Sequence, residues 1–285
     1  MTVPLSGCNS ACSVGSVVSA SLDWKISESA SSTRHAHSAS NKAQESYVGI
    51  EDWTGTVNGV AVEPPIFPGT DFTFIGSVEG TVGVTAPARC VGMTVVIDYS
   101  TATPVMWTLN IAAQGAAGTG LVRGPGAALD LSTPLPVIPK SFIESTIMVA
   151  DVAASPSYAA LANSTKFTIN MTEAAGTYSS STTRLFTGRT PGIIDLNFTI
   201  EGLIQDTTAY TDWPDTNDVQ HVQAWVNATQ HWDIDWMRMT GCTYGAALAD
   251  QTIPVTITGV LAAIQDAGGA ADGNVITPGL TTIWP

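Results

Sequence analysis

The amino-acid sequence predicts a mostly β protein of two similar halves, and three observations support this fold class. Charged residues make up only 12% of the 285 residues, whereas hydrophobic residues make up 44%. Short runs alternate apolar and polar side chains, as strands with one buried face do. A stretch near residue 49 recurs near residue 192. A chain of this length exceeds the usual size of one hydrophobic core, so two domains are expected.

The recurring stretch begins with Gly-Ile-x-Asp at Gly49 and again at Gly192, and it closes on Gly59 and Gly202. Both pairs of glycines are 143 residues apart, which is half the length of the chain. A constant offset of this kind predicts an internal repeat. The structural anchors of the repeat are Gly49, Trp53, Gly59, Gly192, Leu196 and Gly202.

The repeat extends on both sides of this stretch. The offset of 143 places residues 24–26 on residues 167–169, and both have an apolar, polar, apolar pattern. Nearer the C-terminus, residues 107–111 align with residues 253–257 at an offset of 146, after a three-residue insertion. The two halves are therefore expected to contain similar strands in the same order.

Four segments follow from the repeat and from local composition. Residues 1–115 form the first β domain, and residues 116–140, which are rich in Gly and Pro, form a linker. Residues 141–265 form the second β domain, and residues 266–285 form a C-terminal extension. Strands are expected at 22–26, 53–58, 72–75, 94–99 and 106–111, and then at 166–171, 195–201, 232–239 and 253–258.

One short flanking helix is expected in the second domain. Asp215 begins a capping pattern that has another acid three positions later. Val219, Val222 and Val226 then recur at helical spacing. This pattern predicts a helix that ends near residue 230.

Two long polar segments, residues 27–44 and residues 172–187, lack apolar periodicity and are expected to be loops. Nothing in residues 27–44 can form a core, and residues 172–187 are rich in Ser and Thr. Loops of this length inside a compact domain are usually functional or disordered.

The charge of the chain argues against nucleic-acid binding. The chain has 24 acidic residues against ten basic ones, a net charge of −14, and no cluster of Lys or Arg that would neutralise phosphates. No apolar run is long enough to cross a membrane and no secretion signal is present, so synthesis in the cytoplasm is expected. The nearly uncharged surface favours a subunit that is buried among copies of itself.

The sequence predicts no enzyme, no cofactor and no metal site. His35 and His37 have a spacing that metals use, but no third and fourth donor accompany them. Asp233 and Asp235 lie on one strand face without polar helpers, so a solvated face is favoured over acid–base catalysis. No phosphate loop, dinucleotide fingerprint or nucleophile elbow is present.

The first half has a distinctive order of parts. A Val-Pro-Leu-x-Gly hairpin is followed by a strand ending Trp-x-Ile, a Ser/Thr-rich loop, Gly-Ile-x-Asp-Trp-Thr-Gly-Thr-Val-x-Gly, a Pro-rich break and a final set of strands. This order resembles the tail tube (major tail) proteins of long-tailed bacteriophages, best over residues 2–59 and more weakly in the second half. Members of that family usually have one domain per subunit and six subunits per ring, whereas this chain has two domains.

The resemblance implies two tandem tail-tube-like β-sandwich domains, each contributing to an inter-subunit β-barrel around a DNA channel. Homotrimer rings would imitate six subunits and stack into a tube in the virion tail. The implied partners are copies of the chain, terminator, tape measure and tail-tip proteins, and viral DNA that passes through the lumen without specific binding; no membrane is involved. The implied ring-stacking loop residues are Ser31, Arg34, His35, His37, Lys42, Thr177, Ser181, Arg184 and Arg189.

Two other functions are compatible with the same sequence. A capsid decoration or cement protein with this sandwich would bind sites on the head instead of polymerising. A carbohydrate-binding β-sandwich is suggested by the eight tryptophans, but most of these lie in alternating strands, where core packing explains them.

Overall fold

The computed structural model describes residues 10–15, 17–18, 21–35, 45–60, 64–78, 82–115, 120–124, 129, 146–151, 157–179, 186–204, 219–228, 230–245 and 253–261. All regular structure in these residues is β-strand, which confirms the predicted mostly β class. The first half contains β1 (Ser10–Val14), β2 (Val17–Val18), β3 (Ser21–His35), β4 (Glu45–Val60), β5 (Asp71–Val78), β6 (Val82–Asp98), β7 (Met106–Ala113) and β8 (Val122–Gly124). The second half contains β9 (Ile147–Asp151), β10 (Ala159–Ala160), β11 (Ser164–Glu173), β12 (Gly176–Tyr178), β13 (Gly188–Thr190), β14 (Ile194–Ile204), β15 (Val219–Asn227), β16 (Gln230–Tyr244) and β17 (Ile253–Leu261).

The two halves have the same order of strand pairing. Among the described strands, fifteen form one sheet, while β12 and β13 form a separate pair. The first half is paired in the order β2-β1-β5-β6-β7-β4-β3, and the second half in the order β10-β9-β15-β16-β17-β14-β11. With β8, β12 and β13 left out, the strands β1 to β7 of the first half correspond in chain order to β9, β10, β11, β14, β15, β16 and β17 of the second. With this correspondence the two pairing orders are identical.

The register of the central hairpin also recurs. Trp24 on β3 pairs with Val57 on β4, and 143 residues later Phe167 on β11 pairs with Ile200 on β14. Both β3 and β11 have a bulge at the point where they pass the closing glycine of the repeat. A matching bulge is a stronger indication of similarity than alternation, because alternation is common to all strands.

The predicted alignment of β7 with β17 is wrong by two residues. Val57 pairs with Leu109, and Ile200 pairs with Ile257, so Ile257 takes the place of Leu109 and not that of Ile111. A shift of two residues keeps the same side chains on the buried face. The hydrophobic pattern therefore fits both alignments equally well, and only the backbone pairing of β7 with β4 and of β17 with β14 distinguishes them.

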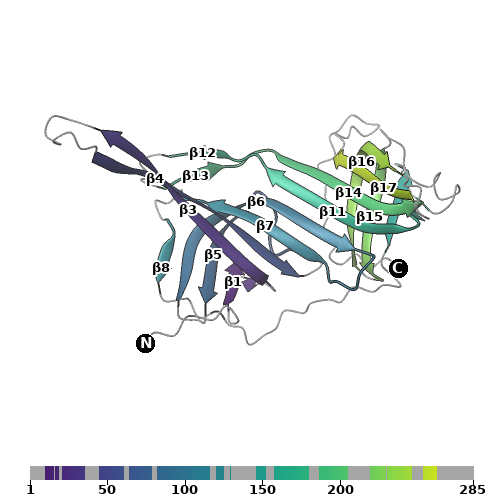
Figure 1. The fold of residues 1–285 in the computed structure, drawn as a ribbon, viewed down its shortest axis with the longest axis horizontal. Helices are drawn as coiled ribbons and strands as arrows, with labels where there is room; N and C mark the ends of the chain where they lie inside the picture. The colour runs from purple at the N-terminus through teal and green to yellow at the C-terminus, as the bar shows by residue number, and fades with distance from the viewer. Residues whose placement is uncertain are drawn as a thin grey trace.

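The two halves share one sheet because β6 pairs with β11 (Figure 1). Along one edge of β6 lie β5 and then β11, and along the other lie β8 and then β7. Phe167 and Ile169 of β11 face Ile97 and Val95 of β6, and all four side chains are buried, so the core continues across this junction. Eight strands thus follow one another in the order β3-β4-β7-β6-β11-β14-β17-β16.

The predicted helix at residues 219–230 is wrong, because β15 occupies this segment. Val222, Ala224 and Val226 are fully buried and recur with a period of two, which places them on one face of a strand. The valines also fit helical spacing, but β-branched residues favour strands, and β15 is an interior strand between β9 and β16. The flanking helix of the predicted fold class is therefore not found in the described part of the chain.

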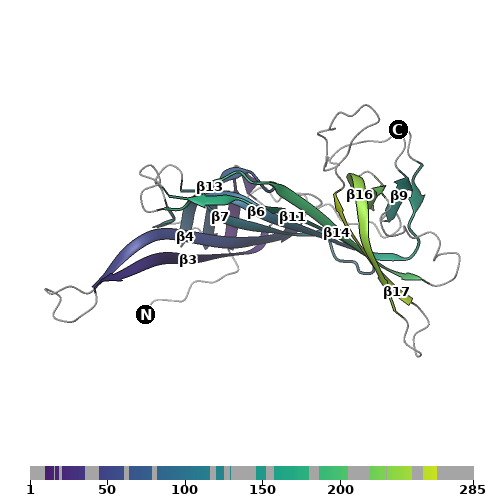
Figure 2. The same cartoon turned by 90° about the horizontal axis from the view of Figure 1, so that it is seen from above.

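The first part of the predicted loop at residues 27–44 is a strand. Residues 27–35 continue β3 and pair with β4, so the two strands form a long hairpin arm (Figure 2). Backbone hydrogen bonds hold such an arm together without any apolar periodicity. In the second predicted loop, residues 172–173 belong to β11, and β12 pairs with β13.

The segments between and after the domains are only partly described. Within the predicted linker at residues 116–140, β8 pairs with β6 and so belongs to the first half. The C-terminal extension at residues 266–285 lies outside the described residues.

Candidate assembly surface

The hairpin arm of β3 and β4 projects from the sheet (Figure 1). It carries three predicted ring-stacking residues. Ser31 and Arg34 are exposed on β3, and His35 is its last residue. Ser31 also fastens the arm, because its Oγ accepts a hydrogen bond from the backbone N–H of Ile50 at 2.8 Å. Four further predicted residues lie outside the described part: His37, Lys42, Ser181 and Arg184.

The second hairpin, made by β12 and β13, is attached to the first half of the chain. The backbone N–H of Thr187 donates to the carbonyl of Glu51 at 3.0 Å, and the N–H of Gly115 donates to the carbonyl of Thr187 at 2.8 Å. Phe186 forms an isolated β-bridge with Glu51. Thr177 on β12, a predicted stacking residue, is exposed.

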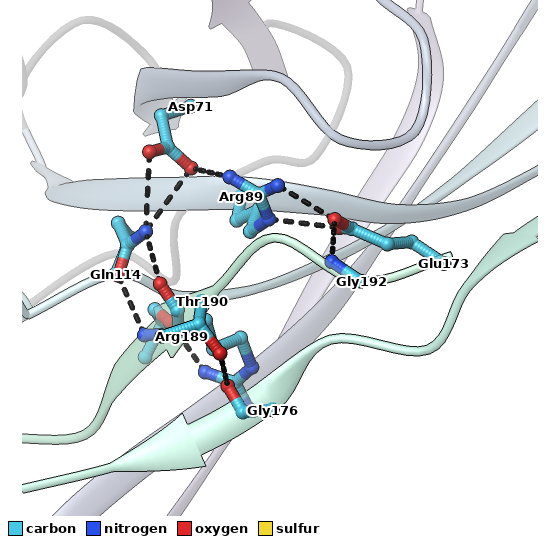
Figure 3. Close-up of polar contacts among 9 residues, drawn as sticks. Asp71, Arg89, Gln114, Glu173, Gly176, Arg189, Thr190 and Gly192 are labelled. Carbon is cyan, nitrogen blue, oxygen red and sulfur yellow. Dashed lines mark hydrogen bonds and ion pairs between the residues drawn. The ribbon is translucent and has the colours of Figure 1, made fainter. Parts of the chain in front are cut away.

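Arg189 was predicted to face a neighbouring ring, but it is buried inside the chain, with a side chain that is 7% exposed. Its guanidinium donates to both carboxylate oxygens of Asp52 at 3.2 Å and to the carbonyl of Ala113. Its backbone N–H donates to Oε1 of Gln114 at 2.8 Å (Figure 3). Arg189 therefore holds the second hairpin against the base of the arm.

A second arginine, Arg89, joins the two halves through an ion pair that sequence reasoning did not find (Figure 3). Its Nε and Nη2 donate to Oε2 and Oε1 of Glu173 at 2.8 and 2.6 Å, a two-point contact. Its Nη1 donates to Asp71 at 2.6 Å, and Gln114 donates to the same carboxylate at 3.1 Å. The N–H of Gly192 donates to Glu173 at 2.9 Å.

The ion pair between Arg89 and Glu173 is buried. The side chains of Arg89 and Glu173 are 4% and 1% exposed. The hydrogen bonds from Arg89 lower the pKa of the Glu173 carboxyl, although burial acts in the opposite direction. The same hydrogen bonds raise the pKa of Arg89. Both groups are held in the charged form, which suits a structural clamp and not a proton-transfer site.

Of the six predicted repeat anchors, five lie in β4 or β14, and Gly192 lies just before β14. Trp53 on β4 and Leu196 on β14 are both buried. Gly59 lies against the ring of Trp107, where a Cβ would overlap the indole. Gly192 similarly leaves no room for a Cβ beside a backbone carbonyl. The remaining anchors, Gly49 and Gly202, are in β4 and β14.

Two edges of the eight-strand series have no strand beside them in the described residues. β3 pairs with β4 alone, so its other edge is open. β16 pairs with β17 along one edge, over residues 237–244, and with β15 along the other, over residues 230–238. No described strand continues that second edge towards Tyr244. Open strand edges are templates for pairing with another chain.

The described residues contain no group of three or more His, Cys, Asp or Glu side chains placed to bind a metal. They also contain no helix of the length and hydropathy needed to cross a membrane. The chain matches no protein-family model and no curated protein. Its function is therefore inferred from its own geometry.

Proposed function

We propose that the chain is a viral structural protein that assembles into stacked rings and forms the tail tube of a long-tailed bacteriophage. The observation that carries this proposal is the identical pairing order of the two halves, with its recurring register and bulge. This agreement supports a duplication of one β-sandwich module. Because β6 of the first module pairs with β11 of the second, each chain already contains one contact between modules.

A ring follows when the same kind of contact is made between copies. In the described residues each chain has eight strands in series, and no described strand lies beside the outer edge of β3 or, on the side of β15, beside residues 239–244 of β16. A head-to-tail contact that closes through rotation produces a ring, and a closed barrel leaves no strand edge exposed. Since each chain supplies two modules, three chains supply six, and a homotrimer ring imitates a hexamer.

The hairpin arm is suited to contacts between rings. It extends away from the sheet (Figure 2). Ser31 and Arg34 are exposed on it. The ladder between β3 and β4 stiffens the arm, so less entropy is lost when it docks on another ring.

The charge of the chain supports a conduit through which DNA passes during ejection. With a net charge of −14, acids that line the lumen would repel the phosphates and prevent adhesion. In this proposal the protein acts in the virion tail, and its ends meet terminator, tape measure and tail-tip proteins.

Negative-stain electron microscopy of the purified chain tests the proposal. Tubes or stacked rings with a central channel support it. Isolated trimers that do not stack would overturn it in favour of capsid decoration. Monomers that bind a glycan array would overturn it in favour of carbohydrate binding.

A further inference from the structure

The junction inside the chain provides a template for the contact between copies. β11 pairs with residues 92–98 of β6, which follow a bulge between Cys90 and Gly92. β16 has a bulge at the matching place, between Met239 and Gly241. The edge of β6 that receives β11 after the bulge therefore corresponds to the edge of β16 that has no described strand beside it.

We propose that β3 of one copy pairs antiparallel with the end of β16 of the next copy, in the register that β11 has on β6, and that Arg238 there forms an ion pair with Glu51. This inference rests on the proposed ring, and it names the residues that meet in the ring. Its partner is a second copy of this chain.

The register follows when the internal pairs are moved to matching positions. At the internal junction Met171 of β11 faces Met93 of β6. The position that matches Met171, 143 residues earlier, is Glu28 on β3. The position on β16 that matches Met93 is Cys242, because each of the two lies one residue after the glycine that ends the bulge of its strand. Glu28 of one copy is thus expected to face Cys242 of the next.

The apolar surface at the end of β16 agrees with this register. Tyr244, the last residue of β16, is 53% exposed. In the proposed register it faces Ile26, which is partly buried against the core of its own copy. The internal counterparts of this pair, Val95 and Ile169, face each other and are buried. Pairing between copies would cover Tyr244 in the same way.

The charges provide an independent match. Arg238 lies directly before the bulge of β16, as Arg89 lies directly before the bulge of β6. Arg89 is buried and bonds Glu173 across the internal junction. Arg238 is exposed and makes no ion pair with a described residue. The residue that matches Glu173 is Ala30, so the carboxylate has to come from a neighbouring position.

Glu51 supplies that carboxylate. It pairs with Ala30 across the hairpin arm, so the two side chains lie on the same face of the arm. Glu51 is exposed, and with Glu28 and Ala30 it lines a pocket at the base of the arm. A guanidinium from the next copy would neutralise Glu51 there, as Arg89 neutralises Glu173 within the chain.

A cysteine cross-link tests the register. Glu28→Cys places a thiol opposite Cys242 of the next copy, and facing residues of antiparallel strands lie within the Cα separation that a disulfide accepts. The matched control is Ser27→Cys, whose side chain points to the other face of the sheet. After assembly and mild oxidation with oxidised glutathione, a non-reducing gel should show covalent dimers and trimers for Glu28→Cys alone. Adding Cys242→Ser should abolish them.

A charge exchange tests the ion pair. Arg238→Glu places two carboxylates together, so the protein concentration needed for assembly should rise about tenfold or more. Adding Glu51→Arg should restore assembly, because the pair is then reversed. Both residues are exposed, so the thermal melting temperature of the unassembled chain should stay unchanged in each variant.

The outcomes separate this inference from the proposed function. Tubes that form while Glu28→Cys cross-links no more than Ser27→Cys would overturn the register and leave the tube intact. Assembly of Arg238→Glu at the unmodified concentration would overturn the ion pair. A wild-type chain that never forms rings would overturn the proposed function, and this inference with it.

Discussion

Replacing Glu173 with Gln should destabilise the chain strongly, because it leaves Arg89 buried without its main partner. The Glu173 side chain is 1% exposed, and it receives two hydrogen bonds from Arg89 and one from Gly192. Removing one member of a buried ion pair costs about 3–5 kcal/mol. Asp71 still accepts a hydrogen bond from Arg89, and glutamine keeps one oxygen, so the expected loss is near the lower end, about 3 kcal/mol.

Thermal unfolding of the unassembled chain measures this loss. In a chain of this size, about 3 kcal/mol corresponds to a fall in Tm of about 6–12 °C. The matched control is Glu201→Gln, which breaks the pair between Lys166 and Glu201 at 2.9 Å, where both side chains are more than one-third exposed. That change should cost about 0–1 kcal/mol. Equal shifts in Tm for the two variants would refute the reasoning that the Arg89 pair clamps the two halves.

Three further results are expected. Because Arg89 holds the pKa of Glu173 below that of free Glu, the stabilisation that this ion pair provides is complete above about pH 4.3 and is lost as the pH falls through the folded-state pKa. The difference in Tm between wild type and Glu173→Gln should therefore shrink in acid. A constant difference from pH 7 to pH 3 would contradict this. Gly59→Ala should lower the free energy of unfolding in urea by about 1–3 kcal/mol, because the added Cβ would overlap Trp107. The control Gly124→Ala, which has no atom near its Cβ, should lower it by less than about 0.5 kcal/mol. Equal losses would count against this packing. Burial raises the pKa of Cys90 to about 12. Mass spectrometry should therefore find Cys90 unmodified by iodoacetamide at pH 8 in the native protein and modified in urea. Rapid labelling of the native protein would show instead that the thiol is accessible.

Most strand positions could be predicted from local pattern. Residues 166–171 alternate apolar and polar side chains, and they lie in β11 as expected. Residues 195–201 likewise lie in β14. Alternation reports burial of one face, and this property depends on near neighbours in the chain. The order of pairing was left open, because it depends on contacts between distant residues.

The errors have physical causes that can be named. Val222 and Val226 are spaced four apart, which fits a helix face and a strand face equally well, and the pairing of β15 on both sides decided between them. The described side chains of the arm, at residues 27–32 and 34, are all exposed, so this part of the strand leaves no hydrophobic signal. Backbone pairing with β4 holds it instead.

The predicted stacking residues differ in their exposure. Ser31, Arg34 and Thr177 are exposed, whereas Arg189 is buried against Asp52, 137 residues away in the chain. A charged residue inside an apolar strand, such as Arg89 between Ala88 and Cys90, was the available signal for a buried pair. Its partner could not be found from sequence, since it lies 84 residues further along the chain.

Electron cryo-microscopy of the assembled protein tests most directly whether two modules in one chain replace two subunits of a ring. The expected map shows three chains per ring, with six modules around a channel and a continuous sheet in which β3 of each chain lies beside β16 of the next. A ring of six chains, or an assembly in which β3 and β16 remain apart, would contradict the account.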